Sequence, residues 1–276
     1  MSTVNQRFAQ ILENHQDLPS IPLVATRALQ MIDDPTCNIN QLGAVISGDP
    51  SLTAKLLRMV NSAYFGFSRE VTRISEAIVM LGFSGTHSMI LGVVSRPLFK
   101  GIAAEKLWIH SLRCATASSI IARDTGICHP DDSFSAGLLH DLGKIILARH
   151  CEKDFLRIEE EQFADDSQRL TREMEVFGAT HPILGEELAT RWKLPTVMIK
   201  SIRYHHSPEQ APEEAMVKVV FAANFLAETD GLSSEEIQAA FEKNISVNFP
   251  VTLNLDSVIE RMKIKTEELI KTFSLF

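Results

Sequence analysis

The sequence predicts an all-α protein, and three observations support this prediction. Apolar residues recur at helical spacing through nearly the whole chain, glycine (13) and proline (11) are sparse, and alternation typical of a strand is confined to residues 244–252. The helical spacing is i, i+4, i+7, i+8, and it is first met at Val4, Phe8, Ile11 and Leu12. We therefore expect a multi-helix bundle preceded by a smaller N-terminal helical module.

Helix boundaries in the first hundred residues are indicated by proline, glycine and capping residues. Breaks at 18–22 and 33–35 separate the first three helices. Asp49 is the expected N-cap of a fourth helix, with Pro50 in its first position. Ser75 is expected to cap a short helix that Gly82 stops. The expected helices cover residues 4–12, 23–32, 39–47, 50–60, 75–80 and 84–98.

The second half of the chain shows the same helical periodicity. The softest junction between the halves lies near 97–101. Ser233 and Glu236 have the spacing of a capping box, which marks the start of the last helix but one. The expected helices cover residues 104–124, 133–149, 152–176, 181–192, 196–206, 213–229, 234–243 and 256–273.

Charge and composition narrow the function classes. The net charge of −8 falls entirely in residues 139–276, so the chain has no global electrostatic reason to bind nucleic acid or an anionic membrane. The four cysteines lie far apart and no signal peptide or apolar run of ~20 residues is visible. We therefore expect a cytoplasmic protein with free thiols. The sequence has no GxGxxG, Walker A or HExxH motif, which removes several common enzyme classes.

Histidines are the chemically informative residues, since eight of the nine fall between positions 87 and 206. His140 and Asp141 are adjacent in an apolar stretch, 134–146, that we expect to be one helix. A charge buried there is costly unless it is paired or bound to a metal. Imidazole together with carboxylate suits Fe, Mn, Zn or Ni. The pair is considered together with His110, His181, His205 and His206.

Each of these residues also has an ordinary structural explanation. Asp141 has the i+3 spacing for an ion pair with Lys144, and His181 precedes a proline at an expected helix start. His205 and His206 could form a polar helix end, where positive charge suits the helix dipole. A packed or exposed role is the interpretation adopted for His15, His87, His129 and His150.

The ordered set of motifs resembles a known family. His110, His140-Asp141-x-Gly143-Lys144, His181-Pro182-x-x-Gly185 and His205-His206 resemble the HD superfamily of metal-dependent phosphohydrolases, especially its HD-GYP branch. The N-terminal motifs are similar to the signature of the HDOD (HD-related output domain) family. They are Leu18-Pro19-x-Ile21-Pro22, Asp49-Pro50-x-Leu52, Asn61-Ser62-Ala63 and Ala77-Ile78-x-x-Leu81-Gly82.

The resemblance covers roughly residues 15–228 and implies three parts. These are an N-terminal helical part of the HDOD module (1–98), an HD-like helical core (101–228) and a C-terminal helical extension (229–276).

The resemblance also implies roles for the site residues. His110, His140 and Asp141 would hold a first divalent metal. A second metal would be held by Asp141, as a bridge, with His181, His205 and His206. Lys144 would face a substrate phosphate, which makes Lys144 and Asp141 the catalytic candidates.

Two departures from the family pattern bear on activity. Asn224 stands where the HD pattern has a further metal-binding aspartate, and its amide oxygen brings no negative charge and cannot act as a base. Lys106, one turn before His110, opposes the third metal that some HD-GYP enzymes hold. The Gly-Tyr-Pro motif of that branch is not present.

Three functions follow as hypotheses. The first is a bacterial signalling or regulatory HDOD module that acts by binding a protein partner or a phosphate-containing small molecule, with a degenerate metal site. The second is an active metal-dependent phosphohydrolase or phosphodiesterase acting on a phosphate ester or cyclic nucleotide. The third is a helical adaptor without metal. All three fit a chain with no expected nucleic-acid or membrane contact.

Overall fold

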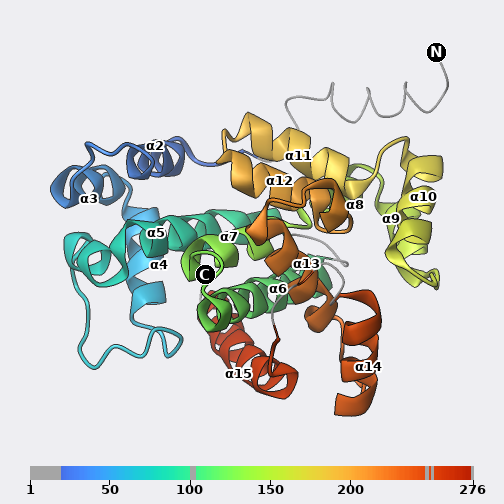
Figure 1. Ribbon diagram of the computed structural model, residues 1–276. Coiled ribbons are helices and arrows are strands. Elements are labelled where there is room, and N and C mark those ends of the chain that lie inside the picture. The colour runs from blue at the N-terminus through green and yellow to red at the C-terminus, as the bar shows by residue number, and fades with distance from the viewer. Residues whose placement is uncertain (1–19, 100–103, 246–248, 250–251, 275–276) are drawn as a thin grey trace.

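The computed structural model describes residues 20–99, 104–245, 249 and 252–274, and every regular element within these ranges is a helix (Figure 1). The prediction of an all-α fold is therefore confirmed. The α-helices in chain order are α2 (Leu23–Ile32), α3 (Ile39–Ser47), α4 (Pro50–Val60), α5 (Ile74–Ser95), α6 (Ala104–Thr125), α7 (Pro130–Leu139), α8 (Leu142–His150), α9 (Glu152–Glu160), α10 (Asp166–Phe177), α11 (His181–Arg191), α12 (Thr196–Tyr204), α13 (Ala215–Ala227), α14 (Ser234–Asn244) and α15 (Leu255–Phe273).

Several sequence signals act as predicted. The Asp49 carboxylate accepts from the backbone N–H groups of Ser51 and Leu52, so it caps α4, and Ser233 and Glu236 form the capping box of α14. Gly82 breaks α5, because its φ of 72° lies in the left-handed region that favours glycine. The expected cap at Ser75 is wrong, since α5 already begins at Ile74.

The single helix expected over 133–149 is two helices. Helix α7 ends at Leu139 and α8 begins at Leu142, so His140 and Asp141 form the turn between them. Asp141 leaves the helical region, with φ −94° and ψ 20°. Apolar spacing could not reveal this break, because the residues on both sides are buried leucines and isoleucines.

The single helix expected over 152–176 is also two helices. Helix α9 ends at Glu160, and Asp165 begins α10 as an N-cap whose carboxylate accepts from the backbone N–H of Gln168 at 3.0 Å. The possible strand over 244–252 has no counterpart among the described residues of that range, and the helix expected over 4–12 lies outside the described residues.

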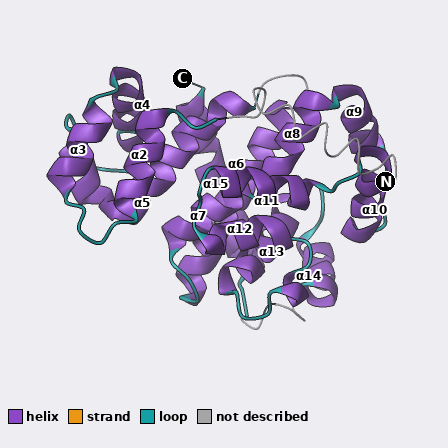
Figure 2. Cartoon of the chain, turned by 90° about the horizontal axis from the view of Figure 1, so that it is seen from above, coloured by secondary structure: helices purple, strands orange, loops and turns teal. Residues whose placement is uncertain are grey.

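Helix α6 is the centre of the fold, with a hydrophobic cluster on each side. One cluster contains Trp108 and Leu112 of α6, extends through α2–α5 and α7–α12, and includes the end of α15. The other contains Ile121 of α6 and is completed by α13, α14 and α15. Helices α2–α5 gather at one end of the molecule and α9 and α10 at the other, as the two views show (Figures 1 and 2). The proposed three-part division stays a prediction.

The longest apolar helix belongs to the first cluster. Among the described residues, only Ile74–Leu98 is long and apolar enough to span a membrane by composition, with a mean hydropathy of 1.7. In the most apolar 18-residue stretch of this segment, 67% of the residues are buried against the rest of the protein, as is usual for a core helix.

Candidate metal centre

Asp141 lies between two groups of histidines that come from four separate segments. In the first group, His110 on α6 and His140 before α8 point their Nε2 atoms at the carboxylate. Each Nε2 lies 3.4 Å from Asp141 Oδ2, and the two Nε2 atoms are 3.1 Å apart. Histidine and carboxylate atoms this close form a possible metal site, which matches the first set implied by the family resemblance.

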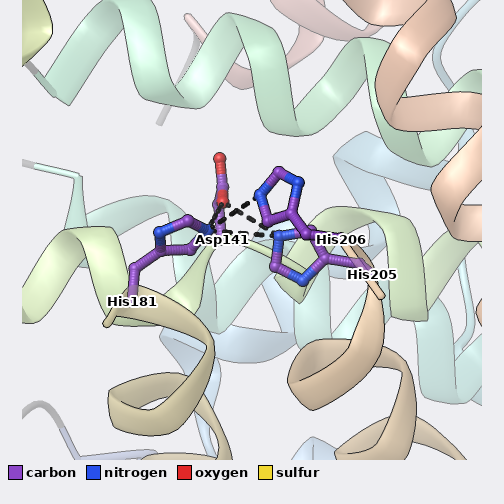
Figure 3. A group of neighbouring side chains, drawn as sticks. All are labelled: Asp141, His181, His205 and His206. Atoms are coloured by element: carbon purple, nitrogen blue, oxygen red, sulfur yellow. Dashed lines mark hydrogen bonds and ion pairs between the residues drawn. The ribbon is translucent and has the colours of Figure 1, made fainter. Parts of the chain in front are cut away.

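The second group, His181, His205 and His206, surrounds the same carboxylate (Figure 3). His181 is the first residue of α11, and His205 and His206 directly follow α12. Nε2 of His181 is 3.3 Å from Asp141 Oδ1, and Nε2 of His205 is 3.6 Å from it. Nε2 of His181 and His206 are 3.1 Å apart. These residues form a second possible metal site that shares Asp141 with the first.

The outer ring nitrogens are held by other groups. Nδ1 of His140 donates to the Gly137 carbonyl at 2.7 Å, and Nδ1 of His205 donates to the Ile202 carbonyl at 2.8 Å. A hydrogen bond donated by Nδ1 orients the ring and leaves Nε2 as the atom that would bind a metal. The rings are therefore oriented for ligation before any metal binds.

Two acidic residues that were not predicted from the sequence hold the Nδ1 atoms of two further rings, His181 and His206. Nδ1 of His181 lies 2.8 Å from Glu173 Oε2, and Nδ1 of His206 lies 2.7 Å from Asp166 Oδ2. Glu173 also accepts from the backbone N–H of His181 at 2.8 Å. Its side chain is almost fully buried, whereas its sequence neighbours are charged and suggest a solvated helix face. Only the packing of α10 near α11 distinguishes it from them.

Two glycines of the family motifs let α8 and α11 approach closely. A Cβ on Gly143 would lie 1.8 Å from the His181 carbonyl oxygen, and a Cβ on Gly185 would lie 2.6 Å from Cγ2 of Ile202. The first contact is with backbone, so glycine is required at 143, whereas a side chain at 185 would force the Ile202 side chain of α12 to move. This contact brings His181 to Asp141.

Lys144 compensates part of the buried charge of Asp141. Its Nζ lies 2.8 Å from Oδ2, and both side chains are buried. Burial alone would raise the pKa of Asp141, but His140 and Lys144 hold it well below its usual range. Burial would lower the pKa of Lys144, but the Asp141 carboxylate raises it. Asp141 is therefore ionised and Lys144 is charged at neutral pH.

The first group of histidines shares a proton. Burial and the neighbouring His140 lower the pKa of His110 to about 3, so this ring is neutral. Burial would also lower the pKa of His140, but Asp141 raises it well above the ordinary value. Asp141 therefore favours the charged form of His140, next to a neutral His110. A divalent metal supplies the same positive charge, so metal binding here would release that proton.

Asn224 completes the first group from α13. It is 5% exposed and lies beside His110. Its Oδ1 is buried and accepts no hydrogen bond of good geometry from a described residue, and the buried Asp141 oxygens have only the ion-pair contacts with Lys144 and the histidines given above. Buried oxygens normally have a partner, and a metal would provide one. The residues therefore fit a metal. Lys106 is exposed on α6 and is not among the clustered residues.

This arrangement defines a helical protein with an HD-type histidine–aspartate centre. The chain belongs to the HDOD family, because the HDOD domain profile matches residues 18–208. The match covers the N-terminal motifs and all of the clustered residues except Asn224.

Individual relatives are distant. An uncharacterized protein of Treponema pallidum is 29% identical over 221 residues, which cover 78% of this chain and 43% of that protein. Ribonuclease Y of Campylobacter hominis is 29% identical over 183 residues, which cover 65% of this chain and 29% of that protein. The chain thus spans less than half the length of these curated relatives.

Solved structures share the fold along the whole chain. An HDOD domain protein of unknown function from Geobacter sulfurreducens aligns with a TM-score of 0.77 and 24% identity over 99% of both chains. A Shewanella amazonensis protein named as a candidate phosphohydrolase aligns with a TM-score of 0.76 and 20% identity, over 96% of this chain and 98% of that one. At these identities the likeness shows the fold alone.

Proposed function

We propose that this chain is a regulatory HDOD module of a bacterial, cytoplasmic signalling system. Its HD centre holds one or two divalent metals, and the module acts by binding rather than by turnover. Its partner is another protein of the signalling chain or a phosphate-containing small molecule. The observation that carries the proposal is a set of metal-ligating side chains that is complete except for one carboxylate, which Asn224 replaces.

The donor set supports a transition metal. The second group offers three imidazoles and the Asp141 carboxylate, all within 4.8 Å of one another. This mixture suits Fe, Mn, Zn or Ni better than Mg or Ca, which prefer oxygen ligands. The anchored Nδ1 atoms add to the argument, since such outer contacts typically accompany real ligands.

Two features of the centre favour binding over catalysis. The amide of Asn224 cannot take up a proton from water, so the first metal position lacks a base and a compensating charge at that side. Lys144, the candidate contact for a substrate phosphate, is only 7% exposed and its ammonium is already paired with Asp141. A phosphate that reached Lys144 would have to compete with that ion pair.

A phosphohydrolase is the second candidate. It rests on the same ligands and on the names of similar proteins, among them ribonuclease Y. A metal in the centre would polarise a phosphate and activate water. In that case Asp141 and the histidines would hold the metal, and Lys144 would bind the phosphate.

The two candidates are separated by an activity test on the metal-loaded protein. Bis-(p-nitrophenyl) phosphate, a cyclic dinucleotide and a single-stranded RNA are incubated with the wild type, Asp141→Ala and Asn224→Asp, with Fe, Mn, Zn or Ni added. We expect the wild type to cleave none of them faster than Asp141→Ala does. Metal-dependent turnover by the wild type that Asp141→Ala loses would overturn the regulatory proposal. Turnover gained by Asn224→Asp alone would support it, because the missing carboxylate would then be the cause of inactivity.

A further inference from the structure

A cavity lies away from the metal centre, where the N-terminal helices meet the core and the C-terminal helix. It has a volume of about 310 Å³ and is lined by residues of α4, α5, α6, α7 and α15, together with the segment between α4 and α5. Its wall is mainly apolar and includes Met59, Met80, Met89 and Leu269. Methionine side chains adapt their shape, which suits a binding site.

A family motif with no part in the metal centre builds one wall of this cavity. The Asn61 side chain pairs with the Val71 backbone through two hydrogen bonds of 2.8 Å, one donated by Nδ2 and one accepted by Oδ1. These bonds close the segment 62–70. The closed segment presents the rings of Tyr64, Phe65 and Phe67 to the cavity.

The aromatic rings of this wall also contact one another and α7. Tyr64 and Phe65 pack edge to face with their centroids 5.0 Å apart, and Tyr64 lies 6.1 Å from Phe134 of α7. Ring contacts of this kind stabilise a preformed wall.

The charged groups of the lining favour an anion. They are Arg123 at the end of α6, Lys265 on α15 and Asp131 on α7. Lys265 Nζ lies 4.8 Å from the Tyr64 ring centroid. Arg123 makes no ion pair within 4.0 Å with any residue in the described part of the chain. The Asp131 carboxylate offsets one of these two positive charges, so the charged groups of the lining sum to one net positive charge.

The cavity is distinct from the metal centre, although α6 and α7 connect the two. His110 lies near the first end of α6 and Arg123 near the last, so the rise of a helix separates them by roughly 20 Å. Helix α7 likewise carries Asp131 and Phe134 at the cavity and leads directly into His140.

We propose that this cavity binds a small amphipathic anion of about ten non-hydrogen atoms in all, with an apolar body and a single carboxylate head. The volume lies at the low end of the range for ligand sites, which sets the size of the ligand. The methionine and aromatic wall takes the apolar body, and Arg123 and Lys265 take the head. This inference goes beyond the proposed function, since it needs neither a metal nor turnover.

The test uses three probes with the same eight-carbon chain and different heads: octanoate, octan-1-ol and octylammonium. Calorimetric titration of the full chain is expected to give an affinity for octanoate at least tenfold higher than for either other probe. Arg123→Gln and Lys265→Gln should each weaken octanoate about tenfold and leave octan-1-ol unchanged. Lys263→Gln is the matched control, because Lys263 is exposed on the same helix and does not line the cavity.

Three results would overturn the proposal. They are equal binding of all three probes, no binding of octanoate at millimolar concentration, and octanoate binding that both lining variants retain in full. Metal content is measured on the same samples and is expected not to differ among these variants. The metal-centre proposal can therefore fail without affecting this one, and the reverse also holds.

Discussion

Replacing Glu173 by glutamine tests whether the outer contacts of the histidines support metal binding. The carboxylate of Glu173 accepts from two donors of His181, its backbone N–H at 2.8 Å and Nδ1 at 2.8 Å. Glutamine has the same shape but one acceptor oxygen, so its amide group would face one of these buried donors. A buried donor left without a partner costs about 1–3 kcal/mol of stability.

The effect on metal affinity follows from the same contact. Loss of an outer hydrogen bond to a ligating histidine typically weakens metal binding 10–100-fold, which is about 1.4–2.7 kcal/mol. We expect Glu173→Gln to weaken Zn²⁺ in this range in competition with a chromophoric chelator. Glu175→Gln is the control, because Glu175 lies on the same helix with 61% of its side chain exposed. The Zn²⁺ affinity of Glu175→Gln should equal that of the wild type.

A double variant separates this positioning role from a general loss of stability. Glu173 acts on the metal through His181, so Glu173→Gln should have no further effect on Zn²⁺ affinity in a His181→Ala background. Equal Zn²⁺ affinity of Glu173→Gln and the wild type would refute the reasoning. A full additional loss in the His181→Ala background would also refute it.

Three further predictions test the contacts that build the fold. Gly143→Ala places a Cβ 1.8 Å from the His181 carbonyl oxygen, so α8 and α11 must separate, and urea unfolding should show a loss of 1–3 kcal/mol or more. Burial lowers the pKa of His87, so its contribution to stability is complete above the unfolded value of about 6.5 and is lost as the pH falls below it. His87→Gln should therefore lose less stability than the wild type between pH 7 and 5, by roughly 1 kcal/mol, and parallel pH profiles would contradict this. Asn61→Ala removes two hydrogen bonds to Val71, so it should lower the free energy of unfolding by about 1–3 kcal/mol and speed proteolysis within residues 62–70. Unchanged cleavage would show that these two bonds do not hold the segment closed.

Most helices of this fold were predictable because their ends carry local signals. Asp49, Gly82 and the capping box at Ser233 act within a few residues of the chain, and the structure has each of them in its expected role. The missed break before α10 also has a local signal, since Asp165 stands three residues before Gln168 in a capping arrangement. The charged residues around it concealed that signal.

The break at His140 and Asp141 has no comparable local signal. Both residues are buried, and every residue from 133 to 147 is buried as well. The turn is stabilised by contacts from distant segments, including His110 on α6 and His181 on α11. Only the tertiary structure brings these segments together.

The candidate site was predictable in its inner residues but not in its outer ones. The histidines stand out because imidazole is rare in apolar stretches, and a resemblance to a family grouped them. Asp166 and Glu173 are two acidic residues among many in the second half of the chain. Their role depends on which of those residues packing directs toward the histidines, and sequence periodicity does not contain that information.

Metal analysis of the full chain, purified without chelators and without a histidine tag, tests the central claim most directly. We predict one or two Fe, Mn, Zn or Ni ions per chain in the wild type. Asp141→Ala should lose this metal while its circular dichroism spectrum keeps the helical signal, because Asp141 is shared by both sets of ligands. Wild-type protein without stoichiometric metal, or an Asp141→Ala variant that keeps all of it, would contradict the account.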